Sequence, residues 1–302
     1  QFWVVTTLAF WIRRAWRLIP SAWLWLAVIL VACVFFDRSG AWGSLRANLE
    51  GALTAVFNVN NLRVMLTYGK FEAGATFPYW SLSLEEQFYL VLPFVVWLCG
   101  KRLPLVLAVV VVLQLVFPRT PLGTIMRCDA LALGVLIAIW SRLDSYRLFE
   151  PRFMANRWVR IALVSILAGG LALAGGEDMH VPVPISLVAF IGAILVFMAS
   201  YDRNYIMAPG WIKKLLLWVG SRSYAIYLIH IPAYFATREI WFRLQPPGIG
   251  FDPNFTGKFL VTAVVLMVVF AELNYRLVEV PLRRRGAEIA TRFRATHLQP
   301  AA

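Results

Sequence analysis

Glu85 and Glu86 are adjacent carboxylates within the stretch WSLSLEEQFYLVLP, which occupies residues 80–93. If the stretch is helical, the side chains of Ser81, Glu85 and Tyr89 share one face, because they recur every four residues. Carboxylate and hydroxyl groups on one face can hold or move a proton or orient a reacting group. The alternative is a helix start at a membrane surface, where acids favour the positive end of the helix dipole.

Arg127 and Asp129 form a second charged group, in the stretch RCDALALG. A guanidinium beside a carboxylate can stabilise an oxyanion or hold an anionic ligand in a fixed position. The alternative is an internal ion pair that locks neighbouring helices together.

The third group is a stripe of hydroxyl and imidazole side chains. On a helix, Ser223, Tyr227, His230 and Tyr234 fall on one continuous face. A single histidine is often a structural residue, but a histidine within such a stripe is a candidate for proton transfer.

Arg13, Arg14 and Arg17 form a basic cluster ahead of Pro20. Guanidinium groups bind phosphate through paired donors, so this cluster is suited to a phosphorylated ligand. The alternative is an anchor at the cytoplasmic surface of a membrane.

The elements that position these residues are predicted to lie in a membrane. The 302-residue chain is 60% hydrophobic and only 15% charged, with a mean hydropathy of +0.69, whereas soluble proteins have about 25% charged residues. A net charge of +13 can indicate a protein that binds nucleic acid. The charges are distributed along this chain as in a membrane protein, so nucleic acid is not expected as a partner. The three cysteines lack metal-binding spacing, so we expect no metal site.

Eight stretches have the apolar character of spanning helices. They are 20–36, 80–99, 103–118, 124–141, 159–175, 181–200, 214–235 and 258–278. Residues 1–12 are interpreted as the tail of a preceding span or an interfacial helix, and residues 37–79 as an outside loop with some interfacial helix. The predicted fold is an all-α, polytopic transmembrane helical bundle that forms a single domain over residues 1–302.

The basic residues orient these spans. With residue 1 in the cytoplasm, 19 of the 29 Lys and Arg residues fall on inside segments, eight fall outside and two lie within spans. This asymmetry follows the positive-inside rule. It predicts a cytoplasmic first residue and a cytoplasmic tail over residues 285–302. It also brings the three polar groups to a similar depth, so we expect a polar cavity that opens outward.

These stretches resemble the motifs of the acyltransferase-3 family of integral membrane acyltransferases, which includes O-acetyltransferases of surface polysaccharides. Five motifs occur in family order and cover residues 10 to 284. They are FWIRRAWRLIP, WSLSLEEQFYLVLP, RCDALALG, GSRSYAIYLIHIP and YRLVEVP.

The resemblance implies ten core helices and transfer of an acyl group, usually acetyl, from cytoplasmic acyl-CoA to an extracytoplasmic hydroxyl. Eight predicted spans and two preceding ones give ten, which also places residue 1 in the cytoplasm. The family has a histidine, thought to be catalytic, in its first span, so that base is expected upstream of this chain. The setting implied is a bacterial inner membrane. No bound cofactor is expected, and the partners are membrane lipid, acyl-CoA and a glycan or lipid-linked acceptor.

The combined hypothesis gives each polar group a role. The catalytic candidates are Glu85, Glu86, Arg127, Asp129 and His230. The acyl-CoA-binding candidates are Arg13, Arg14 and Arg17. The residues expected to line the acceptor cavity are Trp80, Ser81, Ser83, Tyr89, Ser223, Tyr224 and Tyr227.

Two other classes of protein fit the same residues. Intramembrane acids, an arginine and a histidine also suit a proton-coupled transporter or a flippase of envelope glycolipids. Against this alternative, the chain has no inverted repeat and no pair of helices broken by Gly or Pro. A structural subunit of an envelope complex is the third possibility.

Overall fold

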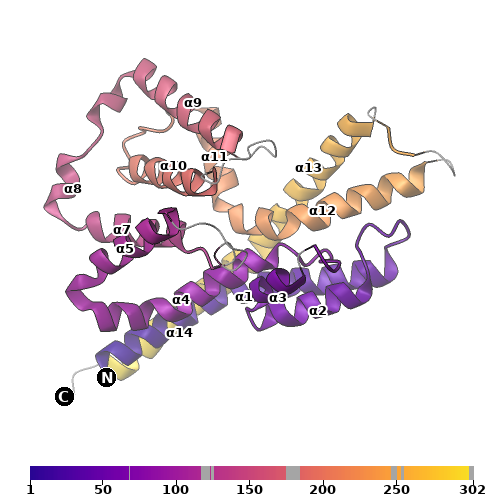
Figure 1. Ribbon diagram of the computed structural model, residues 1–302, viewed down its shortest axis with the longest axis horizontal. Helices are drawn as coiled ribbons and strands as arrows, with labels where there is room; N and C mark the ends of the chain where they lie inside the picture. The colour runs from indigo at the N-terminus through magenta and orange to yellow at the C-terminus, as the bar shows by residue number, and fades with distance from the viewer. Residues whose placement is uncertain are drawn as a thin grey trace. The chain divides into compact units, whose positions relative to one another are not determined.

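The computed structural model describes residues 1–67, 69–116, 123, 126–174, 184–245, 250–252 and 255–298. All regular structure in these residues is helical, which confirms the predicted all-α fold (Figure 1). The helices are α1 (Phe2–Phe35), α2 (Leu45–Val56), α3 (Asn60–Thr67), α4 (Tyr79–Cys99), η1 (Gly100–Arg102), α5 (Leu103–Val116), α7 (Asp129–Trp140), α8 (Asp144–Leu148), η2 (Arg152–Ala155), α9 (Arg157–Ala174), α10 (Pro184–Ala199), α11 (Trp211–Ser221), α12 (Ser223–Leu244), α13 (Phe255–Asn274), η3 (Tyr275–Glu279) and α14 (Val280–Leu298).

Several of these helices have the length and composition of membrane spans. Among the described residues, four helical runs are long and apolar enough to cross a bilayer: Phe2–Phe35, Tyr79–Leu115, Arg157–Ala174 and Phe255–Leu298. Two shorter apolar helices are Asp129–Trp140 and Ser186–Ala199. An integral membrane protein is therefore supported, whereas the total of eight spans stays a prediction. Of the predicted spans, residues 117–118, 124–125, 175 and 181–183 lie outside the described residues.

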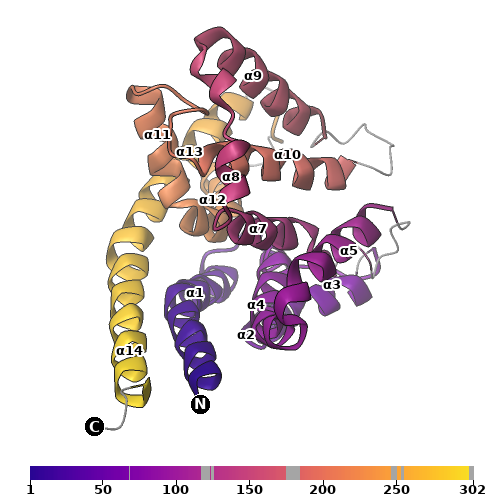
Figure 2. The ribbon, with the colours of Figure 1, turned by 90° about the vertical axis from the view of Figure 1, so that its left-hand side faces the viewer.

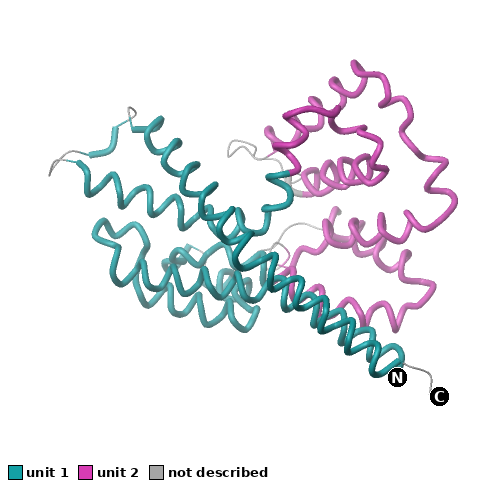
Figure 3. The backbone as a smooth tube through the Cα atoms, turned by 180° about the vertical axis from the view of Figure 1, so that it is seen from behind, with its two compact units in different colours: residues 1–83, 218–302 teal, residues 84–217 magenta. Residues whose placement is uncertain are grey.

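The chain divides into two compact units, which are shown in different colours in Figure 3. The first unit contains residues 1–83 and 218–302, and the second contains residues 84–217. Each unit is described by itself below.

In the first unit, α1 is one continuous helix, so the expected separation between residues 1–12 and the span at 20–36 is wrong. Its 34 residues extend over about 50 Å, well beyond a hydrocarbon core of about 30 Å. The reason for its continuity is the packing of α14 alongside it (Figures 1 and 2). The contact is closest at Gly286, where a Cβ atom would lie 2.2 Å from Cβ of Trp16.

The core of the first unit forms where α1, α12 and α13 meet. Ile29 and Ile229 are fully buried there, beside the small residues Ala225 and Ala271. Small side chains let helix backbones approach closely, which favours packing inside a membrane. Buried polar groups add a second link, because Trp25 Nε1 donates to Asn274 Oδ1 at 3.2 Å.

The predicted span at 214–235 is two helices rather than one, because the helix ends at Ser221 and restarts after Arg222. The Arg222 guanidinium makes two hydrogen bonds to the Glu272 carboxylate, at 2.6 and 3.1 Å. Trp218 Nε1 also donates to Glu272, at 3.0 Å. Glu272 therefore fixes the junction between α11 and α12, and hydropathy along the chain contains no sign of it.

The predicted outside loop at 37–79 contains two helices, α2 and α3, which agrees with the helix expected there. Ser44 caps α2, since its Oγ accepts from the backbone N–H of Ala47 at 3.2 Å. The side chains of Asn48, Asn60 and Asn61 are fully buried. This segment is thus a packed part of the first unit.

The second unit contains two helix packings. In the first, Leu107 and Val111 of α5 pack against Ala132 of α7. In the second, α9 packs against α10, and Met198 of α10 and Met154 of η2 are buried there. The ring of Trp140 stacks on Phe197 with centroids 5.1 Å apart, so α7 also contacts α10.

Candidate functional site

Ser81 and Tyr227, which are 146 residues apart in the sequence, contact each other. Ser81 Oγ lies 2.5 Å from the Tyr227 hydroxyl. That hydroxyl also donates a short hydrogen bond to the backbone carbonyl of Pro78. Since a tyrosine has one hydroxyl hydrogen and a carbonyl only accepts, Ser81 must be the donor to Tyr227. Two of the polar stretches singled out in the sequence therefore meet in the first unit.

His230 lies one helical turn beyond Tyr227, and the two ring centroids are 5.4 Å apart. Nδ1 of His230 is 2.5 Å from the backbone carbonyl of Tyr227. Because the carbonyl only accepts, Nδ1 has the hydrogen, and the neutral ring keeps its lone pair on Nε2. A half-buried imidazole in this tautomer can accept a proton through Nε2.

Hydrogen bonds to neighbouring elements hold the surroundings of this contact. The Tyr79 hydroxyl donates to the Ala22 carbonyl at 2.9 Å, and the Tyr224 hydroxyl donates to the Leu18 carbonyl at 2.6 Å. Both acceptors belong to α1. The starts of α4 and α12 are therefore fixed to the same helix.

The remaining predicted cavity residues of the first unit differ in exposure. Ser83 is buried, and its Oγ accepts from the backbone N–H of Asn60 at 3.2 Å. Trp80 is half-buried, while Ser223, the first residue of α12, is exposed. Only the middle of the predicted hydroxyl stripe is covered, because Tyr234 at its other end is also exposed.

Glu85, Glu86 and Tyr89 lie farther along α4, within the second unit. All three are half-buried. Ser81, Glu85 and Tyr89 follow one another on one face of the helix, as expected from their spacing. Glu85 therefore lies on the same face of α4 as Ser81, whereas Glu86 is turned by about 100° from it.

Arg127 and Asp129 form the ion pair that the sequence predicts, also in the second unit. Nη2 of Arg127 lies 2.9 and 3.2 Å from the two carboxylate oxygens. The Asp129 side chain is 2% exposed and that of Arg127 is 17% exposed. Arg127 precedes α7 rather than lying within a span, and Asp129 is the first residue of the helix. A carboxylate is favoured at that end of the helix dipole.

Gln114 of α5 supports this pair, and the sequence analysis missed it. Its Oε1 accepts from the backbone N–H of Cys128 at 3.0 Å, and its Nε2 donates to the Met126 carbonyl at 3.3 Å. A glutamine within a strongly apolar helix was the signal that could have identified it.

Arg13 and Arg14 are half-buried on α1, and Arg17 is exposed. The neighbouring helix α14 contains three further consecutive arginines at positions 283–285. Because α1 and α14 lie side by side, the two basic segments belong to one pair of helices (Figure 2). The YRLVEVP stretch, residues 275–281, forms the π-helical turn η3 and the start of α14. Oε1 of its buried Glu279 lies 3.7 Å from Nη1 of Arg283.

A cavity of about 450 Å³ lies between α1, α12 and α13. Its lining is apolar apart from Asn274, and includes Trp25, Trp42 and Phe270. Ser81, Tyr227 and His230 do not belong to this lining. The cavity is therefore distinct from the predicted polar cavity, which stays a prediction.

Comparison with known proteins gives a consistent result. Residues 5–272 match the sequence profile of the acyltransferase-3 family, described as an acyltransferase domain. The peptidoglycan O-acetyltransferase OatA of Listeria monocytogenes is 27% identical over 303 residues, which cover 92% of this chain and 46% of the relative. The O-acetyltransferase OatA of Staphylococcus aureus is 23% identical, with 93% and 48% covered.

A third relative is the putative peptidoglycan O-acetyltransferase YrhL of Bacillus subtilis, which is 26% identical over 313 residues. This alignment covers 92% of the chain and 46% of the relative. The chain therefore spans about half the length of the curated relatives it matches. No solved structure matches the chain.

Proposed function

Because the chain belongs to the acyltransferase-3 family, we propose that it transfers an acyl group, in the first instance acetyl, to a hydroxyl group of a glycan or lipid-linked acceptor outside the cytoplasmic membrane. The observation that supports this most directly is the family match over residues 5–272. The contact between Ser81 and Tyr227 adds support, since it joins two of the stretches that resemble family motifs.

The proposed donor is acyl-CoA, bound from the cytoplasmic side. Its phosphates would contact Arg13, Arg14 and Arg17, with the basic segment of α14 adding positive charge nearby. The thioester would extend from there toward the middle of the membrane. The sidedness rests on the distribution of Lys and Arg along the chain.

The proposed acceptor is a glycan, and peptidoglycan is the first to test. Two of the relatives described above are named as peptidoglycan O-acetyltransferases. These relatives are about twice as long as the aligned region, so the acceptor is inferred for the intact protein that contains this chain.

The proposed chemistry is a direct acyl transfer. A histidine base removes the proton from the acceptor hydroxyl, and the oxygen attacks the thioester carbonyl. The resemblance assigns this base to a preceding span, and His230 is the candidate within this chain, through Nε2. The tetrahedral oxyanion collapses, the C–S bond breaks, and the departing thiolate takes up a proton.

The carboxylates and the ion pair have supporting roles in this proposal. Glu85 or Glu86 orients the base or the acceptor hydroxyl. Arg127 stabilises the oxyanion or holds a carboxylate of the acceptor, while Asp129 fixes the direction of the guanidinium group.

The experiment uses the intact protein in proteoliposomes with radiolabelled acetyl-CoA and soluble peptidoglycan fragments. We expect label in the glycan, in an amount that depends on both substrates. A matched sample with labelled glycan tests the rival function. Uptake of the glycan without acetylation would contradict the proposal and favour a transporter or a flippase.

A further inference from the structure

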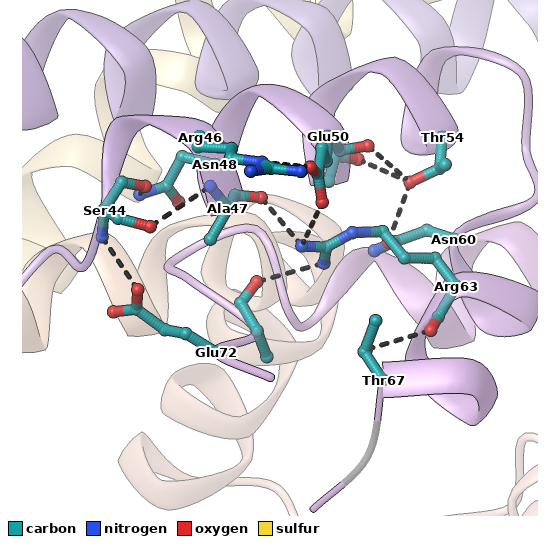
Figure 4. Close-up of polar contacts among 12 residues, drawn as sticks. Ser44, Arg46, Ala47, Asn48, Glu50, Thr54, Asn60, Arg63, Thr67 and Glu72 are labelled. Atoms are coloured by element: carbon teal, nitrogen blue, oxygen red, sulfur yellow. Dashed lines mark hydrogen bonds and ion pairs between the residues drawn. The ribbon is translucent and has the colours of Figure 1, made fainter. Parts of the chain in front are cut away.

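Three side chains from the two preceding helices hold the four residues that lead into α4, Ala73 to Thr76. Figure 4 shows these side chains, Asn48, Asn60 and Arg63, with the contacts of Arg63 to Ala47 and Glu50. Arg63 Nη1 donates to the Ala73 carbonyl at 3.2 Å. Asn48 Oδ1 accepts from the backbone N–H of Ala75 at 2.8 Å. Asn60 Nδ2 donates to the Thr76 carbonyl at 3.1 Å. We call Asn48, Asn60 and Arg63 the clamp, and residues 73–76 the strap.

The clamp side chains are themselves fixed. Asn48 Nδ2 donates to the Trp42 carbonyl at 2.8 Å, and Arg63 Nη2 donates to the Ala47 carbonyl at 3.0 Å. The Thr54 hydroxyl lies 3.1 Å from Asn60 Oδ1, and its one hydrogen is shared between this oxygen and the carbonyls of Glu50 and Gly51. Asn48 and Asn60 are fully buried. Each clamp residue is therefore hydrogen-bonded both to the strap and to another part of the first unit. These bonds fix the direction in which its side chain meets the strap.

Arg63 is a charged group in a buried position, with 7% of its side chain exposed. Its nearest carboxylate is that of Glu50, 3.7 Å from Nη2. Glu50 also pairs with Arg46, a residue whose side chain is 90% exposed. Burying a guanidinium group costs free energy unless its hydrogen bonds are made. We therefore assign Arg63 a geometric role, in which its two Nη groups donate to the carbonyls of Ala73 and Ala47.

The strap fits tightly against α2. Gly74 has a φ of +73°, and a Cβ atom there would lie 2.7 Å from Asn48 Oδ1. A Cβ atom on Gly51 of α2 would lie 1.9 Å from Thr76 Oγ1. These two close approaches leave no room for the strap to slide along the helix.

The strap continues directly into the residues of the candidate site. Pro78 accepts the hydrogen of the Tyr227 hydroxyl, and Ser81 contacts the same hydroxyl. Asn60 makes a second link, because its backbone N–H donates to Ser83 Oγ at 3.2 Å. One residue of the clamp thus holds both the strap and the first turn of α4.

We propose that Asn48, Asn60 and Arg63 are positioning residues for acyl transfer, which set the height and rotation of the first turn of α4 and so align Ser81 with Tyr227 of α12. This inference rests on the proposed function. A residue is rotated by about 100° from its neighbour along a helix, so a small slip at the strap turns Ser81 away from Tyr227.

The test compares Arg63→Met with Arg46→Met in the intact protein. Both variants remove an arginine that pairs with Glu50, but only Arg63 contacts the strap. We expect Arg63→Met to lower kcat at least about tenfold, with the KM for acyl-CoA changed less than about twofold. Arg46→Met should match the wild type. Arg63→Lys keeps the charge without the fork, so it should recover only part of kcat.

Hydrogen exchange provides a readout that does not depend on activity. The backbone amides of residues 73–83 should exchange faster in Arg63→Met than in the wild type or in Arg46→Met. Gly74→Ala, a second way to displace the strap, should have the same two effects if Arg63→Met does not fold.

The outcomes separate the two proposals. A wild-type protein that transfers no acyl group overturns the proposed function and the positioning role that rests on it. An active wild type whose kcat is unaffected by either strap variant overturns the positioning role alone. Lower kcat with unchanged exchange over residues 73–83 also overturns it, because α4 would not have moved.

Discussion

At the scale of single residues, the centre of the candidate site is a short chain of hydrogen bonds from Ser81 through Tyr227 to the Pro78 carbonyl. His230 lies beside it, with Nδ1 directed to the carbonyl of Tyr227. These contacts keep the start of α4 and the middle of α12 in register, and they leave Nε2 of the histidine as a proton acceptor.

Tyr227→Phe tests this chain of bonds. The substitution keeps the ring but removes the hydroxyl that contacts both Ser81 and Pro78. Since one hydrogen bond contributes about 1 kcal/mol, which corresponds to about fivefold in rate, we expect acyl transfer to fall at least about fivefold. The measurement is kcat in proteoliposomes. Tyr234→Phe is the matched control, because Tyr234 is exposed on the same helix, and an equal loss in both variants would contradict the account.

The ion pair of Arg127 and Asp129 gives a second prediction at this scale. Asp129→Asn leaves the partly buried guanidinium without its carboxylate and should destabilise the protein by about 3 kcal/mol. Removing both charges, with Arg127→Met and Asp129→Asn together, should cost less than the single change. Unfolding midpoints measure both effects, with exposed Arg142→Met as the control. A double variant less stable than Asp129→Asn would contradict a structural pairing.

Residue types indicated candidate polar groups, but not their partners. The spacing of Ser81 and Glu85, and of Tyr227 and His230, requires only a helix, so it could be derived from the sequence. The bond from Tyr227 to Pro78 joins residues 149 apart, and no local pattern encodes it. Arg63 was missed for the same reason, since its acceptors are backbone carbonyls, which every residue has.

At the scale of elements, α1 and α14 are the pair that presents the proposed phosphate-binding arginines. The contact at Trp16 and Gly286 is close enough that position 286 accepts only glycine. The position of Arg14 and Arg17 therefore depends on a residue 270 positions away, which no inspection of the basic segment could reveal.

Gly286→Ala tests this packing. The new Cβ atom would lie 2.2 Å from Cβ of Trp16, so the helices must separate, at a cost of about 1 to 3 kcal/mol. We expect a lower unfolding midpoint and weaker binding of acetyl-CoA. Gly134→Ala on α7 is the matched control, since a Cβ atom there meets nothing within 4 Å. Equal stability of the two variants would show that the close contact does not exist.

The segments that follow α8 and α10 give a prediction about pH. A hydrogen bond from Tyr205 and the nearby Arg152 lower the pKa of Glu150 below 4.5, and burial raises the pKa of Tyr205 above 10.0. The stabilisation from Glu150 is complete above its unfolded pKa and is lost as pH falls through the lower folded value. The stabilisation that Tyr205 contributes is complete below the pKa of tyrosine in the unfolded chain. It is lost as pH rises through the higher pKa of Tyr205 in the folded protein.

Unfolding midpoints should therefore be level between about pH 5 and pH 9 and fall on both sides. Tyr205→Phe should reduce the acid dependence, because the pKa of Glu150 returns toward 4.5. Tyr234→Phe, at an exposed position, is the control. If Tyr205→Phe lost stability at acid pH to the same extent as the wild type, the hydrogen bond from Tyr205 to Glu150 would be contradicted.

Helix boundaries followed from the sequence to within two residues in α4 and α9. They did not at two segments that contain arginines. Arg13, Arg14 and Arg17 indicated a break, yet α1 continues because α14 packs along it. Arg222 was placed inside a span, yet it separates α11 from α12 because Glu272 of α13 binds it there.

At the scale of the whole molecule, composition predicted an integral membrane protein, and apolar runs of about 20 residues predicted that its spans are helical. The family match accounts for 268 of 302 residues, from 5 to 272, and so extends over both units. The family assignment therefore applies to residues of both units.

The most direct test of the central claim is acyl transfer measured with the intact protein, the double variant Glu85→Gln and Glu86→Gln, and the exposed control Glu288→Gln. Radiolabelled acetyl-CoA and peptidoglycan fragments are the substrates. We predict transfer by the wild type and the control, and a loss of at least about 100-fold in the double variant. Equal transfer by all three proteins would contradict the placement of the active site on α4.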